Sequence, residues 1–100
     1  MPMTNACKIS SRTSSKILDG RMVNISANGF AFASYEQDIK DMKGTLVCLK
    51  VDDFDLLNGK DLYGHIIRIS DNDGEYIVGC RMLDDNMEIY NFVEENYRGR

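Results

Sequence analysis

The sequence contains one proline, one histidine and no pair of closely spaced cysteines, and each lack argues against a class of structure or site. Pro2 is the only proline, so the turns must be made by glycine and Asx residues instead. His65 is the only histidine, and Cys7, Cys48 and Cys80 form no CxxC pair, so a zinc site has little support. Cys48 and Cys80 lie within apolar runs, which predicts free, buried thiols compatible with a reducing cytosol.

The chain also lacks an excess of positive charge and a long apolar run. Its 12 basic and 16 acidic residues give a net charge of −4, which argues against DNA or RNA binding through clustered cations. A small anionic ligand would need only a local basic pocket. No segment has the length of a membrane span or the pattern of a signal peptide. The 100 residues therefore predict one cytoplasmic domain, residues 1–100, either complete or part of a longer chain.

Turn signals divide the chain into short segments. Asx-Gly pairs, which favour tight hairpin turns, occur at 19–20, 28–29, 58–59 and 73–74, and a further turn is expected at 41–44. Between these turns the apolar residues alternate, as in half-buried strands. We expect Val47, Leu49 and Val51 to share one face of a strand, and Tyr76, Val78, Cys80 and Met82 to share one face of another. In a third strand His65, Ile67 and Ile69 should share a face, with Arg68 on the opposite face. Five or six such strands predict a mainly β fold, a small barrel or sandwich.

The last segment changes its period. Asp85 and Glu88 have the spacing of a capping box, and apolar residues then recur along one face of a predicted helix, residues 86–97. We expect this face to pack on the barrel, the alternative being a partner-binding helix.

Reactive groups do not gather in the sequence. His65 lies among alternating apolar residues, which favours a structural histidine, and the acidic stretch 71–75 lacks the full spacing of a calcium-binding loop. No phosphate-binding loop, nucleophile elbow or dinucleotide fingerprint is present. We therefore predict a binding protein without catalytic activity, metal site or cofactor.

The segment Asn24–Gly29 is the strongest candidate for a binding site. An apolar run precedes it and another follows it, so strands should lead in and out. Asn24 and Ser26 are two residues apart, share a face, and carry groups able to read the polar edge of a base. Gly29 permits positive φ or close approach of a ligand to the backbone. The alternative is a turn in which Asn24 and Ser26 bond their own backbone.

This segment resembles the (D/N)-x-S-x-x-G motif of the PilZ domain family. The strand pair 64–69 and 76–82 is similar to the late strands of that family, with Gly79 and Arg81 in place and Met82 where phenylalanine is usual. A C-terminal helix follows in both, so the resemblance covers residues 16–97. It implies a six-stranded antiparallel β-barrel with one C-terminal α-helix.

The resemblance also implies a function. PilZ domains are best known for binding cyclic di-GMP, a bacterial second messenger, and for relaying the signal to a linked domain or partner protein. By this resemblance Asn24 and Ser26 would bond a guanine, and Gly29 would leave room for it. Family members usually hold the ligand phosphates with an RxxxR motif ahead of the first strand.

The chain departs from the family at this second motif. Its nearest approach is Arg12 to Lys16, where lysine is a poor substitute for a two-pronged arginine. Only seven residues separate Lys16 from Asn24, so we expect 7–12 to be the first strand, 16–25 the second, and the RxxxR position to fall at or before Met1.

Three hypotheses follow from these observations. The first is a cyclic di-GMP receptor in which Arg12, Lys16 or residues upstream of Met1 supply the cations. The second is a PilZ-like adaptor that binds a protein and no nucleotide. The third, a barrel that binds single-stranded nucleic acid, is disfavoured by the low basic charge and by the lack of an aromatic platform.

Overall fold

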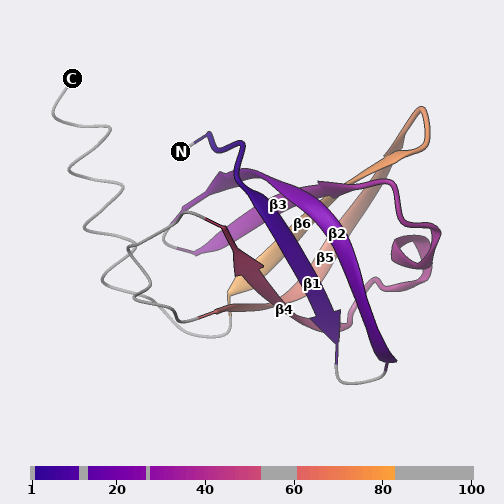
Figure 1. The fold of residues 1–100 in the computed structure, drawn as a ribbon, viewed down its shortest axis with the longest axis horizontal. Coiled ribbons are helices and arrows are strands. Elements are labelled where there is room, and N and C mark those ends of the chain that lie inside the picture. The colour runs from indigo at the N-terminus through magenta and orange to yellow at the C-terminus, as the bar shows by residue number, and fades with distance from the viewer. Residues whose placement is uncertain (1, 12–13, 27, 53–60, 83–100) are drawn as a thin grey trace, which may run out of the picture.

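The alternating segments form six antiparallel strands in a computed structural model that describes residues 2–11, 14–26, 28–52 and 61–82. The strands close into a barrel in the order β1-β2-β3-β6-β5-β4 (Figure 1). Their bounds are β1 Ala6–Ser11, β2 Ser14–Ile25, β3 Gly29–Ser34, β4 Leu46–Val51, β5 Leu62–Asn72 and β6 Glu75–Met82, and a 3-10 helix η1, Gln37–Asp41, joins β3 to β4. The predicted six-stranded barrel is confirmed, and so is the division of the first 25 residues into two strands. The helix predicted at 86–97 lies outside the described residues.

The inward-facing residues of all six strands form one core. Its fully buried members include Ile9, Met22, Ile25, Phe32, Leu49, Ile66 and Val78. The predicted faces of β4 and β6 are confirmed, because Val47 and Leu49 are buried while Lys50 is exposed, and Tyr76, Val78 and Cys80 are all buried. A closed barrel leaves no edge strand to pair with another chain.

The predicted face of β5 was wrong. Leu62, Gly64 and Ile66 point inward, whereas His65 and Ile67 are exposed. The pairing with β6 shifts between Ile66 and Arg68, which marks a β-bulge. A bulge adds one residue to a strand and reverses the alternation beyond it. His65 is therefore a surface residue rather than a structural histidine of the core.

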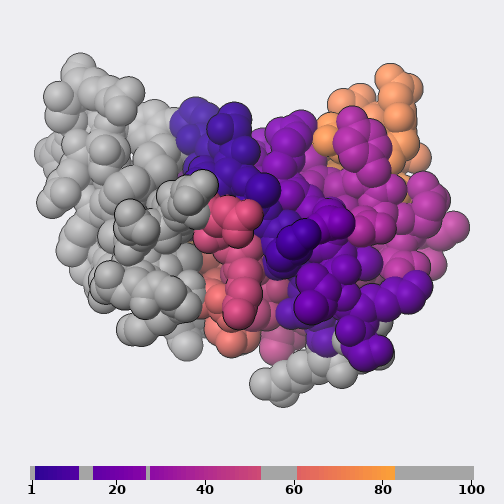
Figure 2. Space-filling view, in the orientation of Figure 1, coloured from indigo at the N-terminus to yellow at the C-terminus, as the bar shows by residue number. Residues whose placement is uncertain are grey.

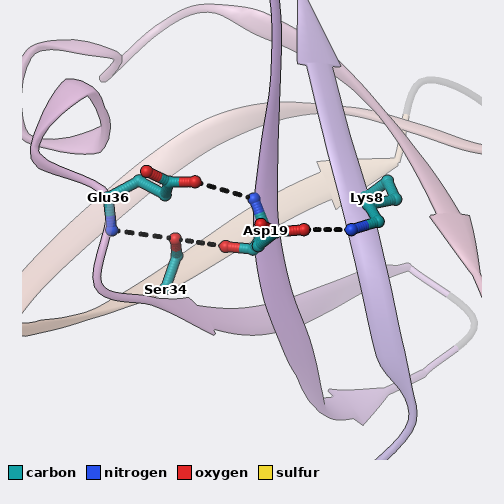
Figure 3. Close-up of polar contacts among 4 residues, drawn as sticks. All are labelled: Lys8, Asp19, Ser34 and Glu36. Atoms are coloured by element: carbon teal, nitrogen blue, oxygen red, sulfur yellow. Dashed lines mark hydrogen bonds and ion pairs between the residues drawn. The ribbon is translucent and has the colours of Figure 1, made fainter.

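The turn predicted at 19–20 was also wrong, because β2 runs through both residues. On one side Asp19 pairs with Lys8 of β1, and the two side chains form an ion pair. On the other side of β2, strand β3 ends at Ser34, and side chains bond the Asp19 backbone in place of a strand partner (Figure 3). Ser34 Oγ donates to the Asp19 carbonyl at 2.6 Å, and the Asp19 N–H donates to Glu36 Oε2 at 3.0 Å. These bonds satisfy the backbone of Asp19 and keep β2 extended.

The glycine turns at 73–74 and 41–44 behave as predicted, whereas Gly29 of the pair at 28–29 already belongs to β3 and has no positive φ. Asp73 and Gly74 have φ values of 53° and 91° and join β5 to β6 in a two-residue hairpin, as expected for a primed turn. Gly44, at φ 87°, ends the predicted turn before β4. The tip of the β5–β6 hairpin stands clear of the rest of the surface (Figure 2). The pair at 58–59 lies outside the described residues.

The three cysteines are free, but they are not equally buried. Cys7 and Cys80 are in the core, and burial raises the pKa of Cys7 to about 11 and that of Cys80 to about 12. Cys48 is only half-buried, with its Sγ 3.3 Å from Asp61 Oδ2. The prediction of a buried thiol is confirmed for Cys80 and holds in part for Cys48.

No helix in the ranges that the structure describes is long and apolar enough to cross a membrane.

Candidate functional site

The segment from Asn24 to Gly29 connects the end of β2 to the start of β3. Ile25 is fully buried between Asn24 and Ser26, which are both exposed. The predicted arrangement, with Asn24 and Ser26 on one face, is therefore confirmed. The connection is closed by a backbone bond, in which the Ser26 N–H donates to the Gly29 carbonyl at 2.8 Å.

The two polar side chains of the motif differ in their partners. Ser26 Oγ donates to the Gly29 carbonyl at 3.2 Å, so the alternative of a local backbone bond holds for this residue. Because a hydroxyl retains acceptor capacity, Ser26 can still receive a bond from a ligand. The Asn24 amide makes no hydrogen bond to any described residue. Its donor and acceptor are both available at the surface.

Gly29 serves strand packing. Its φ is not positive, so no unusual backbone conformation requires glycine here. A Cβ at Gly29 would instead overlap the carbonyl oxygen of Cys80 in β6. Glycine thus lets β3 and β6 approach closely, a reason that sequence inspection alone did not identify.

The N-terminal residues run beside the motif. Pro2 forms an isolated bridge with Asn24, the Met3 N–H donates to the Val23 carbonyl at 2.9 Å, and the Met22 N–H donates to the Asn5 carbonyl at 2.7 Å. Any segment fused ahead of Pro2 would therefore emerge next to Asn24. The position labelled N in Figure 1 lies near this end of β2.

Lys16, predicted as a ligand-binding cation, is not brought to the motif. It lies eight residues before Asn24 on β2, or about 26 Å at roughly 3.3 Å per strand residue. Its Nζ is 3.2 Å from Asp38 Oδ2, so its charge is already balanced. Arg12, the other predicted cation, lies outside the described residues.

Two arginines from the late strands do lie on the motif's side of the barrel. Gly29 pairs with Arg81 of β6, which pairs in turn with His65 of β5. Arg68 of β5 pairs with Gly79 of β6. Sequence inspection placed Arg68 and Arg81 on their strands but did not connect them with the motif. The alternation was visible in the sequence, whereas the pairing of β3 with β6 was not.

The described residues contain no group of three or more His, Cys, Asp and Glu side chains placed to hold a metal ion. The polar groups around the motif are instead an amide, a hydroxyl, an imidazole and two guanidinium groups. This set suits hydrogen bonding to a polar, anionic organic ligand.

Comparison with solved structures shows which proteins share this barrel. The PilZ domain of CeSA from a cellulose-synthesizing bacterium has a TM-score of 0.59 at 23% sequence identity, over 99% of this chain and 94% of that chain. MrkH of K. pneumonia in its apo state has a TM-score of 0.65 at 13% identity, over 100% of this chain and 50% of MrkH. At these identities the similarity concerns the fold.

The family assignment rests on the sequence. No curated protein matches the chain. The family model of the PilZ domain, however, matches residues 1–95, and thus includes the motif, the late strand pair and every described strand. The chain belongs to the PilZ domain family.

Proposed function

We propose that this protein binds cyclic di-GMP on the outer surface of its barrel and relays the signal to a linked domain or a partner protein. The observation that carries the proposal is the exposed pair Asn24 and Ser26, presented on one face where β2 ends. In a chain of the PilZ family, these residues occupy the positions of the (D/N)-x-S-x-x-G motif.

The chemistry of the pair fits a guanine. An asparagine amide offers donors and an acceptor in one plane, so it can form paired bonds with the polar edge of a base. Asn24 has no competing bond within the described structure, and Ser26 keeps an open acceptor. The binding energy would come from existing surface groups without rearrangement of the core.

Relay to another domain or protein is the second part of the proposal. This chain spans half of MrkH, so a barrel of this shape occurs within a longer protein. Membership of the PilZ family favours a regulatory binding module rather than an enzyme. We propose that this module acts in the cytoplasm.

Calorimetric titration with cyclic di-GMP tests the first part. We expect saturable heat with the wild-type chain and at least fivefold weaker binding by Asn24→Ala, because a bidentate contact to a base contributes about 1–3 kcal/mol. Asn72→Ala is the matched control, since Asn72 is an exposed asparagine at the distant tip of the β5–β6 hairpin. Its affinity should equal that of the wild type.

The absence of heat at high micromolar ligand would refute nucleotide binding by this chain. The adaptor hypothesis would then replace it, and affinity capture of a protein partner would be its test. Equal affinities of Asn24→Ala and wild type would show that the ligand lies elsewhere.

A further inference from the structure

The strand pairing places the motif and two arginines on one outer surface. Asn24 pairs with Ala31, Ala31 with Gly79, and Gly79 with Arg68. Because directly paired residues point to the same side of a sheet, these four form one row across β2, β3, β6 and β5. A neighbouring row runs from Gly29 through Arg81 to His65. With strands about 4.8 Å apart, Asn24 and Arg68 are about 14 Å apart across the sheet.

The middle of this surface is made of very small residues. Gly29, Ala31 and Gly79 carry nothing larger than a methyl group, and neighbouring atoms cover much of them, since Ala31 is 8% exposed and Gly79 is also buried. The side chains that alternate with them, such as Phe30, Phe32 and Val78, point into the core. We name the residues Gly29, Ala31 and Gly79 the floor. A planar ring can approach the backbone over such small residues once the side chains that cover them, Arg68 among them, move aside.

Arg68 leans over this floor from β5. Its Nη2 is 3.3 Å and its Nε 3.5 Å from the position that a Cβ of Gly79 would occupy. The guanidinium therefore lies against Gly79, and it extends from β5 across β6 in the direction of β3. A larger residue at position 79 would push it away.

The two arginines differ in their surroundings from three of the other described cations, whereas Lys40, Lys43 and Lys50 likewise form no ion pair among the described residues. Lys8, Lys16 and Arg21 form ion pairs with Asp19, Asp38 and Glu75 respectively. Arg68 and Arg81 have no carboxylate partner among the described residues. Among the described residues, therefore, no carboxylate neutralises either guanidinium group, and each can contact an anion, although the whole chain carries a net charge of −4.

We propose that Arg68 and Arg81 hold the phosphates of the nucleotide whose guanine is bound by Asn24 and Ser26, so that the ligand lies on the floor. This inference rests on the proposed function and assigns the cations of the site to β5 and β6 rather than to Lys16. Guanidinium groups suit the task because their planar fork binds two phosphate oxygens at once.

Titration with cyclic di-GMP at two salt concentrations tests the assignment. Arg68→Gln and Arg81→Gln should each weaken binding at least tenfold and flatten its salt dependence. Arg68→Lys should recover only part of the loss, because lysine keeps the charge without the fork. Lys50→Gln is the control, since Lys50 is exposed on β4, on the opposite side of the barrel from β3, and its affinity should stay within twofold of wild type.

The outcomes separate the two proposals. Wild-type affinity and salt dependence in both glutamine variants would overturn this inference and leave the proposed function intact. A wild-type chain that binds no cyclic di-GMP would overturn both. Because both arginines are exposed, all variants should keep the wild-type unfolding midpoint, and a lowered midpoint accounting for the loss of binding would count against a direct phosphate contact.

Discussion

The two faces of β3 have different roles, one in stability and the other in the proposed binding. The inner face carries Phe30 and Phe32, which fill the core. Gly29, Ala31 and Ala33 alternate with them on the outer face, where Ala31 and Ala33 are themselves covered, at 8% and 1% exposure. Stability thus depends on large residues pointing one way, and the proposed binding surface depends on small residues pointing the other way. A strand side chain alternates with period two, so one six-residue segment meets both demands.

The largest effect is expected on the inner face. Phe32→Ala removes a fully buried ring at the centre of the core and should lower the free energy of unfolding by about 3–5 kcal/mol. Urea denaturation followed by circular dichroism would measure this. The comparison fails if the loss is below about 1 kcal/mol, because the inner face would then not be the main source of stability.

Gly29→Ala tests the contact between β3 and β6. The added methyl group would overlap the Cys80 carbonyl, so the strands must shift, and overpacking of this kind costs about 1–3 kcal/mol. Binding of cyclic di-GMP should weaken as well, because Asn24 and Ser26 are held by the same connection. Gly44→Ala is the control. Its φ of 87° disfavours alanine but nothing lies within 4 Å, so it should lose stability alone.

On the outer face a substitution should affect binding as well as stability. Ala31→Leu places a bulky side chain on the floor and should weaken cyclic di-GMP binding at least tenfold in calorimetry. Because Ala31 is only 8% exposed, the larger side chain must displace its neighbours, and the free energy of unfolding should fall by about 1–3 kcal/mol. Ala6→Leu, on the exposed part of β1, should alter neither quantity. If Ala31→Leu binds cyclic di-GMP with wild-type affinity, the ligand does not lie on the floor.

A basic arm should strengthen binding at the same face. Fusing an Arg-x-x-x-Arg segment ahead of Met1 would deliver two guanidinium groups beside Asn24, because Pro2 pairs with that residue. We expect affinity to rise several-fold and to become more sensitive to salt. An arm of equal length with glutamine in place of arginine is the control. Unchanged titration curves for the arginine arm would refute the explanation.

A dependence of stability on pH is expected from the buried thiols. Their pKa values of about 11 and 12 exceed the ordinary value of 9.0, so the folded chain keeps protons that the unfolded chain releases. The stability that this contributes is complete below pH 9 and is lost as the pH rises from 9 towards 12. Urea midpoints between pH 8 and pH 10.5 should show the decline, and Cys80→Ala should make it shallower. If the urea midpoints of the wild type and of Cys80→Ala fall with pH at the same rate, the buried Cys80 thiol is not a source of the decline.

Local features of the sequence predicted the strands and part of the site. Alternation located β4 and β6, and the pair at 73–74 marked a hairpin because Asp and Gly tolerate the positive φ that such a turn needs. The Asp-Gly pair at 19–20 led to a wrong prediction of a turn, because hydrogen bonds with Ser34 and Glu36 hold Asp19 in a strand. These partners lie more than a dozen residues away, so no local pattern could show them.

The sequence by itself determined that Asn24 and Ser26 share an exposed face, because residues two apart on a strand must point the same way. Only the tertiary structure decided what surrounds them. The pairing of β3 with β6 brought Arg81 to Gly29, and the pairing of β6 with β5 brought Arg68 to the row of Asn24. The length of β2 carried Lys16 away from the motif. Which strands become neighbours depends on closing the whole barrel around one core, and no single segment contains that information.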